Sequence, residues 1–178
     1  MFRLRRLGSM LLLILLIALW AWLELSKAPP RQIRAADGAV VHIIDGDSLR
    51  IGKTEIRIAG IDAPEYRQQC GDGSGGQWDC GKAAREQLVK LAGVGGLVCT
   101  ERATDRYGRT LADCHTDQGD IGRAMMSAGL ALGANDPRFD QHELEIAEAR
   151  QARRGIWRGP HVHPAEWRKA QTAEQPEN

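Results

Sequence analysis

The feature that most limits the fold of this 178-residue chain is a series of short β-strand patterns separated by tight turns. Apolar and β-branched residues are frequent in segments 39–44, 48–51 and 54–61, and the dipeptides Asp45-Gly46 and Gly52-Lys53 interrupt them. Connections this short join neighbouring strands that run in opposite directions. The series therefore predicts an antiparallel meander of three strands.

The remainder of the chain adds helices to this meander. In chain order, we expect a glycine-rich loop at residues 66–81, a helix at 82–91, strands at 97–103 and 110–116, and helices at 121–128 and 138–154. This order predicts an α+β domain, with a small strand barrel and helices packed to one side. We place the domain at residues 38–158 and expect a C-terminal tail at 159–178, disordered after Trp167.

The N-terminal segment, residues 1–28, has the composition of an export signal and is expected to form a hydrophobic helix. Three arginines among the first six residues precede an apolar run at 10–23, which predicts that the basic end stays in the cytoplasm. A spanning helix needs about 20 apolar residues, so a cleaved signal peptide, an uncleaved anchor and a buried core helix are all open. Trp20 and Trp22 suit a membrane interface and favour the anchor.

A polar, proline-bearing linker follows at residues 29–37. We expect the folded domain beyond it to be exported. It would either be anchored in the inner membrane and face the periplasm, or be secreted or periplasmic after cleavage of the signal.

The charge of the exported part limits how it can bind nucleic acid. Beyond residue 28 the chain carries 20 Lys and Arg against 22 Asp and Glu, a net charge of −2. A near-neutral domain has no basic surface as a whole, so phosphate must be bound by a few arginines at defined positions. The sequence indicates no protein partner, and we expect a monomer.

Four cysteines occur in this domain: Cys70, Cys80, Cys99 and Cys114. Export to an oxidising compartment favours two disulfides, which we expect to be Cys70–Cys80 and Cys99–Cys114. If the second hairpin turns at its central pair 106–107, Cys99 faces Cys114 at a distance that a disulfide can span. Four buried thiols are the alternative, and a zinc site is a third, although the cysteine spacings match no zinc pattern.

Acidic residues in two short segments could bind a metal ion. Asp45 and Asp47 flank a glycine, and Asp62 and Glu65 surround Pro64, which must end a strand. If Asp47 and Asp62 meet at the ends of paired strands, two carboxylates, a backbone carbonyl and waters would form an oxygen site suited to Ca²⁺. The alternative is ordinary turn chemistry, since Asp-Gly is common in hairpins and Asp is common before Ala-Pro.

Arg57 and Arg109 are candidate phosphate donors, because a planar guanidinium can give two parallel hydrogen bonds to phosphoryl oxygens. An exposed strand arginine is the alternative interpretation of each. Strict alternation would place Arg57 and Asp62 on opposite faces of their strand. We therefore expect a bulge at Gly60 that brings them to one side.

The chain resembles the staphylococcal nuclease (thermonuclease-like) family over about residues 41–157. Four motifs carry the resemblance: Ile-Asp-Gly-Asp-Ser at 44–48, Arg-Ile-Ala-Gly-Ile-Asp-Ala-Pro-Glu at 57–65, Thr-Asp-Arg-Tyr-Gly-Arg-Thr-Leu-Ala at 104–112, and Gly-Ile-Trp at 155–157. The resemblance implies a five-stranded OB-type β-barrel with three packed α-helices, and a Ca²⁺-dependent nuclease that acts on DNA and RNA.

The resemblance also implies the acidic part of the site. Asp47 and Asp62 look like the calcium carboxylates, and the Ala63 carbonyl looks like a backbone ligand. Asp45 looks like a carboxylate that lies beside the metal without binding it. Glu65 looks like the residue that orients or deprotonates the attacking water.

The basic part of the site is implied in the same way. Arg57 and Arg109 look like the pair that binds the scissile phosphate during catalysis. Arg106 and Tyr107 look like substrate-binding contacts to a terminal phosphate or nucleotide.

The chain departs from the family where nucleotide-binding tyrosines are expected, since Leu-Gly-Ala-Asn at 132–135 follows Ala131 instead. Base stacking from that side is therefore in doubt. Trp78, in the cysteine-closed loop, could stack on a base, but packing under the loop is favoured. The five histidines form no motif, and we expect surface or structural roles for them.

These features together predict a metal-dependent hydrolase of the endonuclease type, acting on DNA or RNA outside the cytoplasmic membrane. One alternative is a non-catalytic OB-fold module that binds nucleic acid. Another is a role at the cell envelope with a different acidic polymer, such as a polysaccharide.

Overall fold

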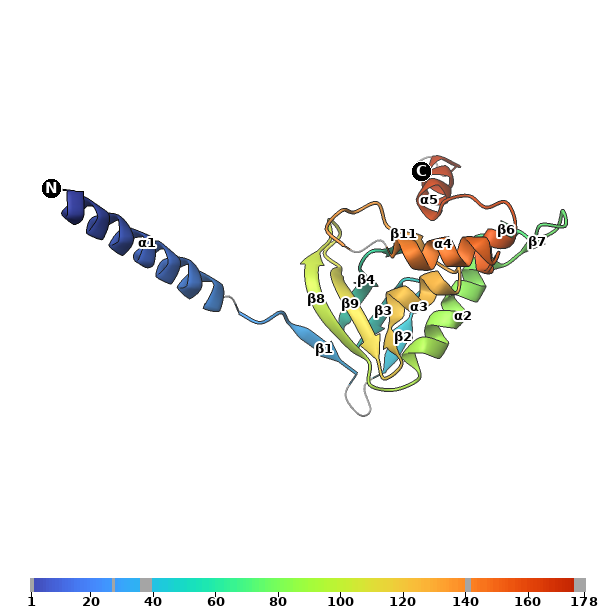
Figure 1. Cartoon of the computed structure of the whole chain (residues 1–178). Helices are drawn as coiled ribbons and strands as arrows, with labels where there is room; N and C mark the ends of the chain where they lie inside the picture. The colour runs from blue at the N-terminus through green and yellow to red at the C-terminus, as the bar shows by residue number, and fades with distance from the viewer. Residues whose placement is uncertain (1, 27, 36–39, 140–141, 175–178) are drawn as a thin grey trace. The chain divides into compact units, whose positions relative to one another are not determined.

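The computed structural model describes residues 2–26, 28–35, 40–139 and 142–174, which form parts of two compact units, Met1–Pro30 and Arg31–Asn178 (Figure 1). The first unit contains helix α1 (Phe2–Leu25), whose large apolar side chains between Met10 and Leu25 are exposed where they are described. Among the helices described, none has the length and apolarity of a membrane span.

The second unit is built on a curled sheet that contains all five strands expected from the sequence. These strands are β2 (Val41–Ile43), β3 (Ser48–Ile51), β4 (Thr54–Ile58), β8 (Val98–Thr104) and β9 (Thr110–Thr116). The strand order is β1-β8-β9-β4-β3-β2, and β10 (Gly119–Asp120) also pairs with β9. Strand β1 (Gln32–Arg34) pairs with β8 and lies in the segment predicted to be a linker, so that part of the prediction is wrong.

Two small sheets accompany the large one. Strand β5 (Ile61–Asp62) pairs with β11 (Leu132–Gly133), and β6 (Cys70–Gly71) pairs with β7 (Gln77–Trp78) inside the expected loop. Alternation along the strands buries one face, which supplies Leu49, Ile56 and Ile58 to the main core.

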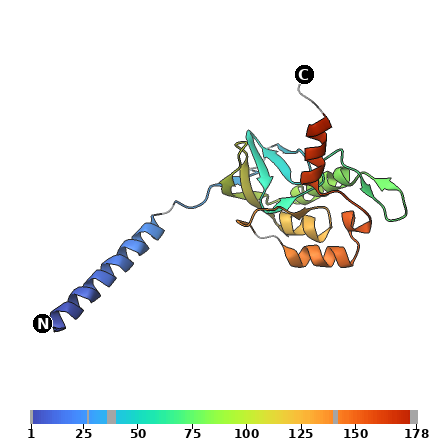
Figure 2. The same ribbon diagram turned by 90° about the horizontal axis from the view of Figure 1, so that it is seen from above.

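Helices α2 (Cys80–Ala92), α3 (Ile121–Ser127) and α4 (Glu143–Gln151) correspond to the three predicted helices and pack in series on one side of the sheet (Figures 1 and 2). Ala84 and Leu88 of α2 and Met125 of α3 are buried against the sheet residues. Helix α4 begins later than predicted, and a 3₁₀ turn, η1 (Gly155–Arg158), follows it. The described residues thus form an α+β domain.

A further helix, α5 (Pro164–Glu174), lies in the predicted C-terminal tail and continues past Trp167, where we predicted disorder. Proline is favoured in the first turn of a helix because its missing N–H is not needed there, and Glu166 in the first turn complements the helix dipole. The segment lacks a long apolar face, and ion pairs to the rest of the domain hold it instead, as described below. The described residues therefore contain five α-helices, including α1. The sequence predicted four, namely an N-terminal hydrophobic helix and three packed helices.

Both predicted disulfides, Cys70–Cys80 and Cys99–Cys114, are present. Cys99 faces Cys114 in the β8–β9 ladder, as expected, but the register between these strands shifts once, between Glu101 and Ala103. Nearer the tip, Thr104 faces Thr110, so the turn is centred on Tyr107 instead of between Arg106 and Tyr107. The irregularity inserts one residue, and this insertion restores the pairing that the disulfide needs.

Candidate active site

The candidate site begins where β4 ends and the chain turns into β5. Gly60 has φ +78°, a left-handed conformation that favours glycine, and residues 59–60 form a turn between the two strands. As a result, Nη2 of Arg57 lies 2.7 Å from Oδ1 of Asp62. The expectation that Gly60 brings these two side chains to one side is confirmed, although a turn does so rather than a one-residue bulge.

Asp47 is 2% exposed, and hydrogen-bond donors surround both of its carboxylate oxygens. Oδ1 accepts from the Ser48 hydroxyl and from Nη1 of Arg57, both at 2.8 Å. Oδ2 accepts from the Ala63 amide at 3.0 Å and lies 2.8 Å from Nη2 of Arg57. The Asp47 amide in turn donates to Oδ1 of Asp45 at 3.2 Å. Burial raises the pKa of Asp47 to about 7, against the lowering effect of Arg57.

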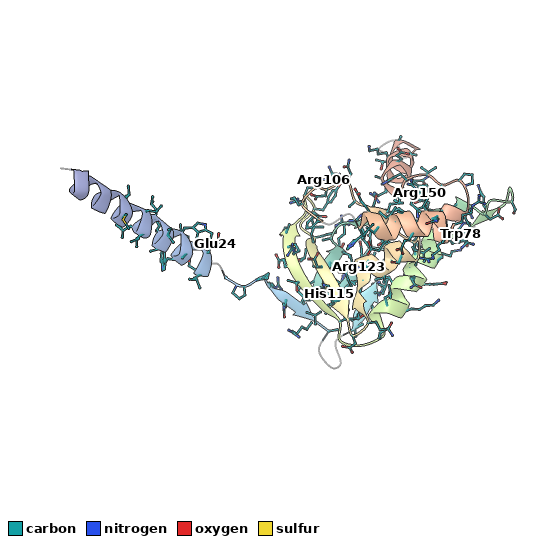
Figure 3. The ribbon with its side chains drawn as sticks, viewed as in Figure 1. Glu24, Trp78, Arg106, His115, Arg123 and Arg150 are labelled. Atoms are coloured by element: carbon teal, nitrogen blue, oxygen red, sulfur yellow. A yellow bond between two sulfur atoms is a disulfide. The ribbon has the colours of Figure 1, made fainter. Side chains whose placement is uncertain are left out.

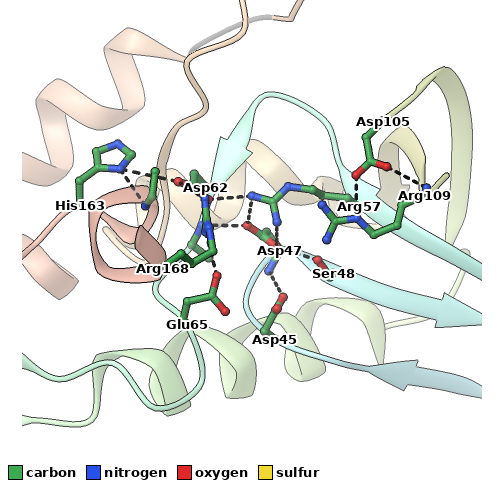
Figure 4. Close-up of polar contacts among 12 residues, drawn as sticks. Asp45, Asp47, Ser48, Arg57, Asp62, Glu65, Asp105, Arg109, His163 and Arg168 are labelled. Atoms are coloured by element: carbon green, nitrogen blue, oxygen red, sulfur yellow. Dashed lines mark hydrogen bonds and ion pairs between the residues drawn. The ribbon is translucent and has the colours of Figure 1, made fainter. Parts of the chain in front are cut away.

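A second guanidinium, from Arg168 in α5, joins Asp62 to Glu65 (Figure 4). Its Nη1 donates to Oδ1 of Asp62 at 2.9 Å and to Oε1 of Glu65 at 2.8 Å, and its Nη2 donates to Oδ2 of Asp62 at 3.2 Å. Nδ1 of His163 lies 3.7 Å from the same Oδ2. Burial acts to lower the pKa of Arg168, but the hydrogen bonds to Asp62 and Glu65 outweigh it and the pKa is raised. Arg168 therefore remains charged.

The backbone of Glu65 is fixed by contacts with later segments of the chain. Its amide donates to Oε1 of Gln68 at 3.2 Å, and the buried Gln68 donates through Nε2 to the Val162 carbonyl at 2.7 Å. Gly81 in the first turn of α2 packs against the Glu65 backbone, where an added Cβ would lie 1.7 Å from the carbonyl oxygen. These contacts attach the segment before α5 to the site and hold the Glu65 side chain near Asp62.

Arg109 directly precedes β9, which runs parallel to β4 with Thr110 facing Ile56. Its Nε lies 2.7 Å from Oδ2 of Asp105, and its guanidinium is directed toward the Arg57 side of the cluster in Figure 4. Asp105 also accepts from the amides of Tyr107 and Arg109, at 2.8 and 2.9 Å. Asp105 thus orients Arg109. No contact of Arg109 with Asp47 or Asp62 is described.

Arg106 and Tyr107 lie in the turn at the tip of the β8–β9 hairpin, where Figure 3 labels Arg106. The Arg106 guanidinium stacks 4.7 Å from the Tyr107 ring centroid, and the tyrosine is 68% exposed. Trp78 packs against the protein, which is the role favoured for it from the sequence. Its Nε1 donates to the Gly71 carbonyl at 3.2 Å, and Arg158 lies over its ring at 4.0 Å.

The described residues contain no group of three or more His, Cys, Asp or Glu side chains arranged as a metal site. The set inferred from the sequence has only two carboxylates, from Asp47 and Asp62, and guanidinium groups fill the space next to both. With Asp45 and Glu65, the cluster has four carboxylates and two arginines, an excess of two negative charges when all are ionised. Hard oxygen donors with this excess fit a divalent cation, provided that Arg57 and Arg168 release or share the oxygens of Asp47 and Asp62 that they contact.

Sequence reasoning missed Arg168 and His163. His163, for which a surface or structural role was expected, is partly exposed and lies beside Asp62. No local pattern places these residues beside Asp62, which is about a hundred positions earlier in the chain. The only sequence signal was the Pro164 and Glu166 start of the helix that carries Arg168.

The chain is similar in sequence to known proteins. The family model described as staphylococcal nuclease homologue matches residues 55–159. The chain is 32% identical over 178 residues to "Protein ParB" of Escherichia coli, covering 89% of this chain and 87% of that protein. It is 31% identical to "Micrococcal nuclease" of Shigella flexneri, covering 75% of this chain and 80% of that protein. It is 29% identical to "Succinoglycan biosynthesis protein ExoI" of Rhizobium meliloti, covering 68% of this chain and 64% of that protein. This chain belongs to the family of staphylococcal nuclease homologues.

Proposed function

We propose that this protein is a calcium-dependent nuclease that hydrolyses phosphodiester bonds of DNA or RNA, built on an OB-type barrel. The observation that carries the proposal is the single hydrogen-bonded network of Asp47, Arg57, Asp62, Arg168 and Glu65, in which Arg168 links Glu65 to Asp62 and the members come from separate stretches of the chain. Relatives named as nucleases, such as the Shigella flexneri protein, support the same activity.

Each side chain in the network has a role that its chemistry allows. Asp47 and Asp62 would hold the cation, with the Ala63 carbonyl as a further ligand and Asp45 beside them. When bound, Ca²⁺ would polarise the phosphoryl oxygens. Glu65 orients the attacking water or accepts its proton, because its carboxylate lies at the edge of the cluster and is less enclosed than Asp47.

The two arginines stabilise the charge that develops on the phosphoryl group. A guanidinium has five N–H donors, and the described contacts of Arg57 with Asp47 and Asp62 account for three. The other two are available to phosphoryl oxygens. Arg109, oriented by Asp105, approaches from the neighbouring strand and completes the pair of phosphate donors.

We also propose that the domain acts outside the cytoplasmic membrane. Two disulfides in a 178-residue chain support an oxidising compartment, because cytosolic thiols are normally kept reduced. The N-terminal segment, which is basic and then apolar, also supports export across the cytoplasmic membrane.

The proposal predicts rapid cleavage of single-stranded DNA or RNA by the purified protein in Ca²⁺, and almost none in excess chelator. The rate of appearance of short labelled fragments measures this directly. Restoring Ca²⁺ after chelation should restore cleavage, which separates metal removal from irreversible unfolding. Equal rates with Ca²⁺ and with chelator would contradict calcium dependence, and no cleavage in either would contradict nuclease activity.

A second candidate function is action on an acidic polysaccharide at the cell envelope, which the relative named for succinoglycan biosynthesis favours. The same assay separates the two functions when an acidic glycan is supplied in place of nucleic acid. Cleavage of the glycan alone would support this second function.

A further inference from the structure

A groove of about 680 Å³ lies between the tip of the β8–β9 hairpin and helix α5. Arg106 and Tyr107 form the hairpin wall, and α5 forms the opposite wall. Figures 1 and 3 show the hairpin tip, with Arg106, on the same side of the domain as α5. The residues contributed by α5 are Ala165, Arg168, Lys169, Thr172 and Ala173.

The groove has the charge of a polyanion site. Three of the residues that line it are basic, namely Arg106, Arg168 and Lys169, and none is acidic. Because Arg168 is already paired with Asp62 and Glu65, Arg106 and Lys169 supply the charge for phosphates. The exported part of the chain has a net charge of −2, so this concentration of basic groups is local. A groove lined by one sign of charge attracts the opposite sign, and a nucleic-acid backbone presents a regular series of phosphates.

The groove also adjoins the candidate active site. Arg168 lines it and at the same time donates to Asp62 and Glu65 at 2.8–3.2 Å. A strand bound in the groove would therefore continue directly to the carboxylates. Arg168 acts here as a positioning residue, since its contacts hold α5 next to these two acids.

The exposed ring of Tyr107 favours a single strand over a duplex. The residue is 68% exposed and lies on the wall of the groove. Unpaired bases can stack on an aromatic ring, whereas the bases of a duplex are already stacked on one another.

We propose that helix α5 forms the second wall of a groove for single-stranded nucleic acid, in which Lys169 and Arg106 bind backbone phosphates from opposite sides. This inference rests on the proposed nuclease function for its substrate class. It adds a binding surface from the C-terminal helix, beyond residues 55–159 that match the family.

Equilibrium binding in chelator tests the groove without cleavage. The probe is a fluorescent single-stranded oligonucleotide, and its affinity for the full-length protein is measured by anisotropy at several salt concentrations. Each phosphate contact on a single strand contributes about 0.7 to the slope of log affinity against log salt. Lys169→Gln should weaken binding several-fold at low salt, for any base sequence, and reduce the slope by about 0.7. Arg106→Gln combined with Lys169→Gln should reduce it by about 1.4.

Lys90→Gln is the matched control, because it removes the same charge from the exposed last turn of α2, which ends away from α5 in Figure 1. It should leave the affinity and the slope unchanged. Equal behaviour of Lys169→Gln and Lys90→Gln would overturn the inference, as would equally tight binding of a duplex. Failure of the nuclease proposal would appear differently, as intact binding with no Ca²⁺-dependent cleavage.

Discussion

Replacing Arg57 with methionine is expected to destabilise the calcium-free protein by about 3–5 kcal/mol and to abolish cleavage. Arg57 is the shared partner of Asp47 and Asp62, whose side chains are 3% and 5% exposed. Without it, two carboxylates lie close together with little access to water and one fewer positive charge between them. Urea unfolding in chelator measures the loss of stability.

Calcium should recover more stability in Arg57→Met than in the unaltered protein, because the cation supplies the positive charge that the variant lacks. Arg50→Met is the matched control, since Arg50 lies on the adjacent strand and forms an exposed ion pair with Glu55. Its effect should stay within about 0.5 kcal/mol. Similar losses of unfolding free energy in Arg57→Met and Arg50→Met would show that Arg57 does not stabilise the buried carboxylates.

Replacing Glu65 with glutamine is expected to slow cleavage about 10²- to 10⁴-fold while leaving the fold and nucleic-acid binding intact. The amide keeps the shape of the side chain but cannot accept a proton from water. Single-turnover rates on labelled single-stranded DNA in saturating Ca²⁺ give the effect on the chemical step. Binding of the same strand in chelator shows whether the site is still formed.

Glu55→Gln provides the control for this substitution, because Glu55 lies on β4 and contacts Arg50 at the surface. It should cleave at the rate of the unaltered protein. If Glu65→Gln also retained that rate, the acid would have no part in activating water. Another group would then have to act as the base.

The sequence predicted the part of the site that local pattern and motif define. Tight turns and strand alternation gave the five strands, and the glycine at position 60 explained how Arg57 and Asp62 reach one side. The two disulfides were predicted from export to an oxidising compartment, and the Cys99–Cys114 pair also from the strand pairing of the second hairpin. The register shift after Glu101 could not be predicted, because a strand irregularity depends on contacts across the sheet rather than on the strand itself.

The contribution of α5 was missed for a different physical reason. Its composition is polar, and a short polar segment near a terminus usually remains disordered. In the folded domain Arg168 reaches two acids that lie more than a hundred residues earlier, and these charge-assisted hydrogen bonds hold the helix. Such long-range pairing leaves no periodic signal in the sequence.

The central claim is that Asp47 and Asp62 bind a divalent cation between them. Calorimetric titration of Ca²⁺ into the full-length protein tests it without any assay of activity. We predict a single Ca²⁺ bound by the unaltered protein and by Glu55→Gln, and an affinity at least about tenfold lower for Asp47→Asn and Asp62→Asn, since each loses one charged ligand. Undiminished binding by both asparagine variants, or no binding by the unaltered protein, would contradict the account.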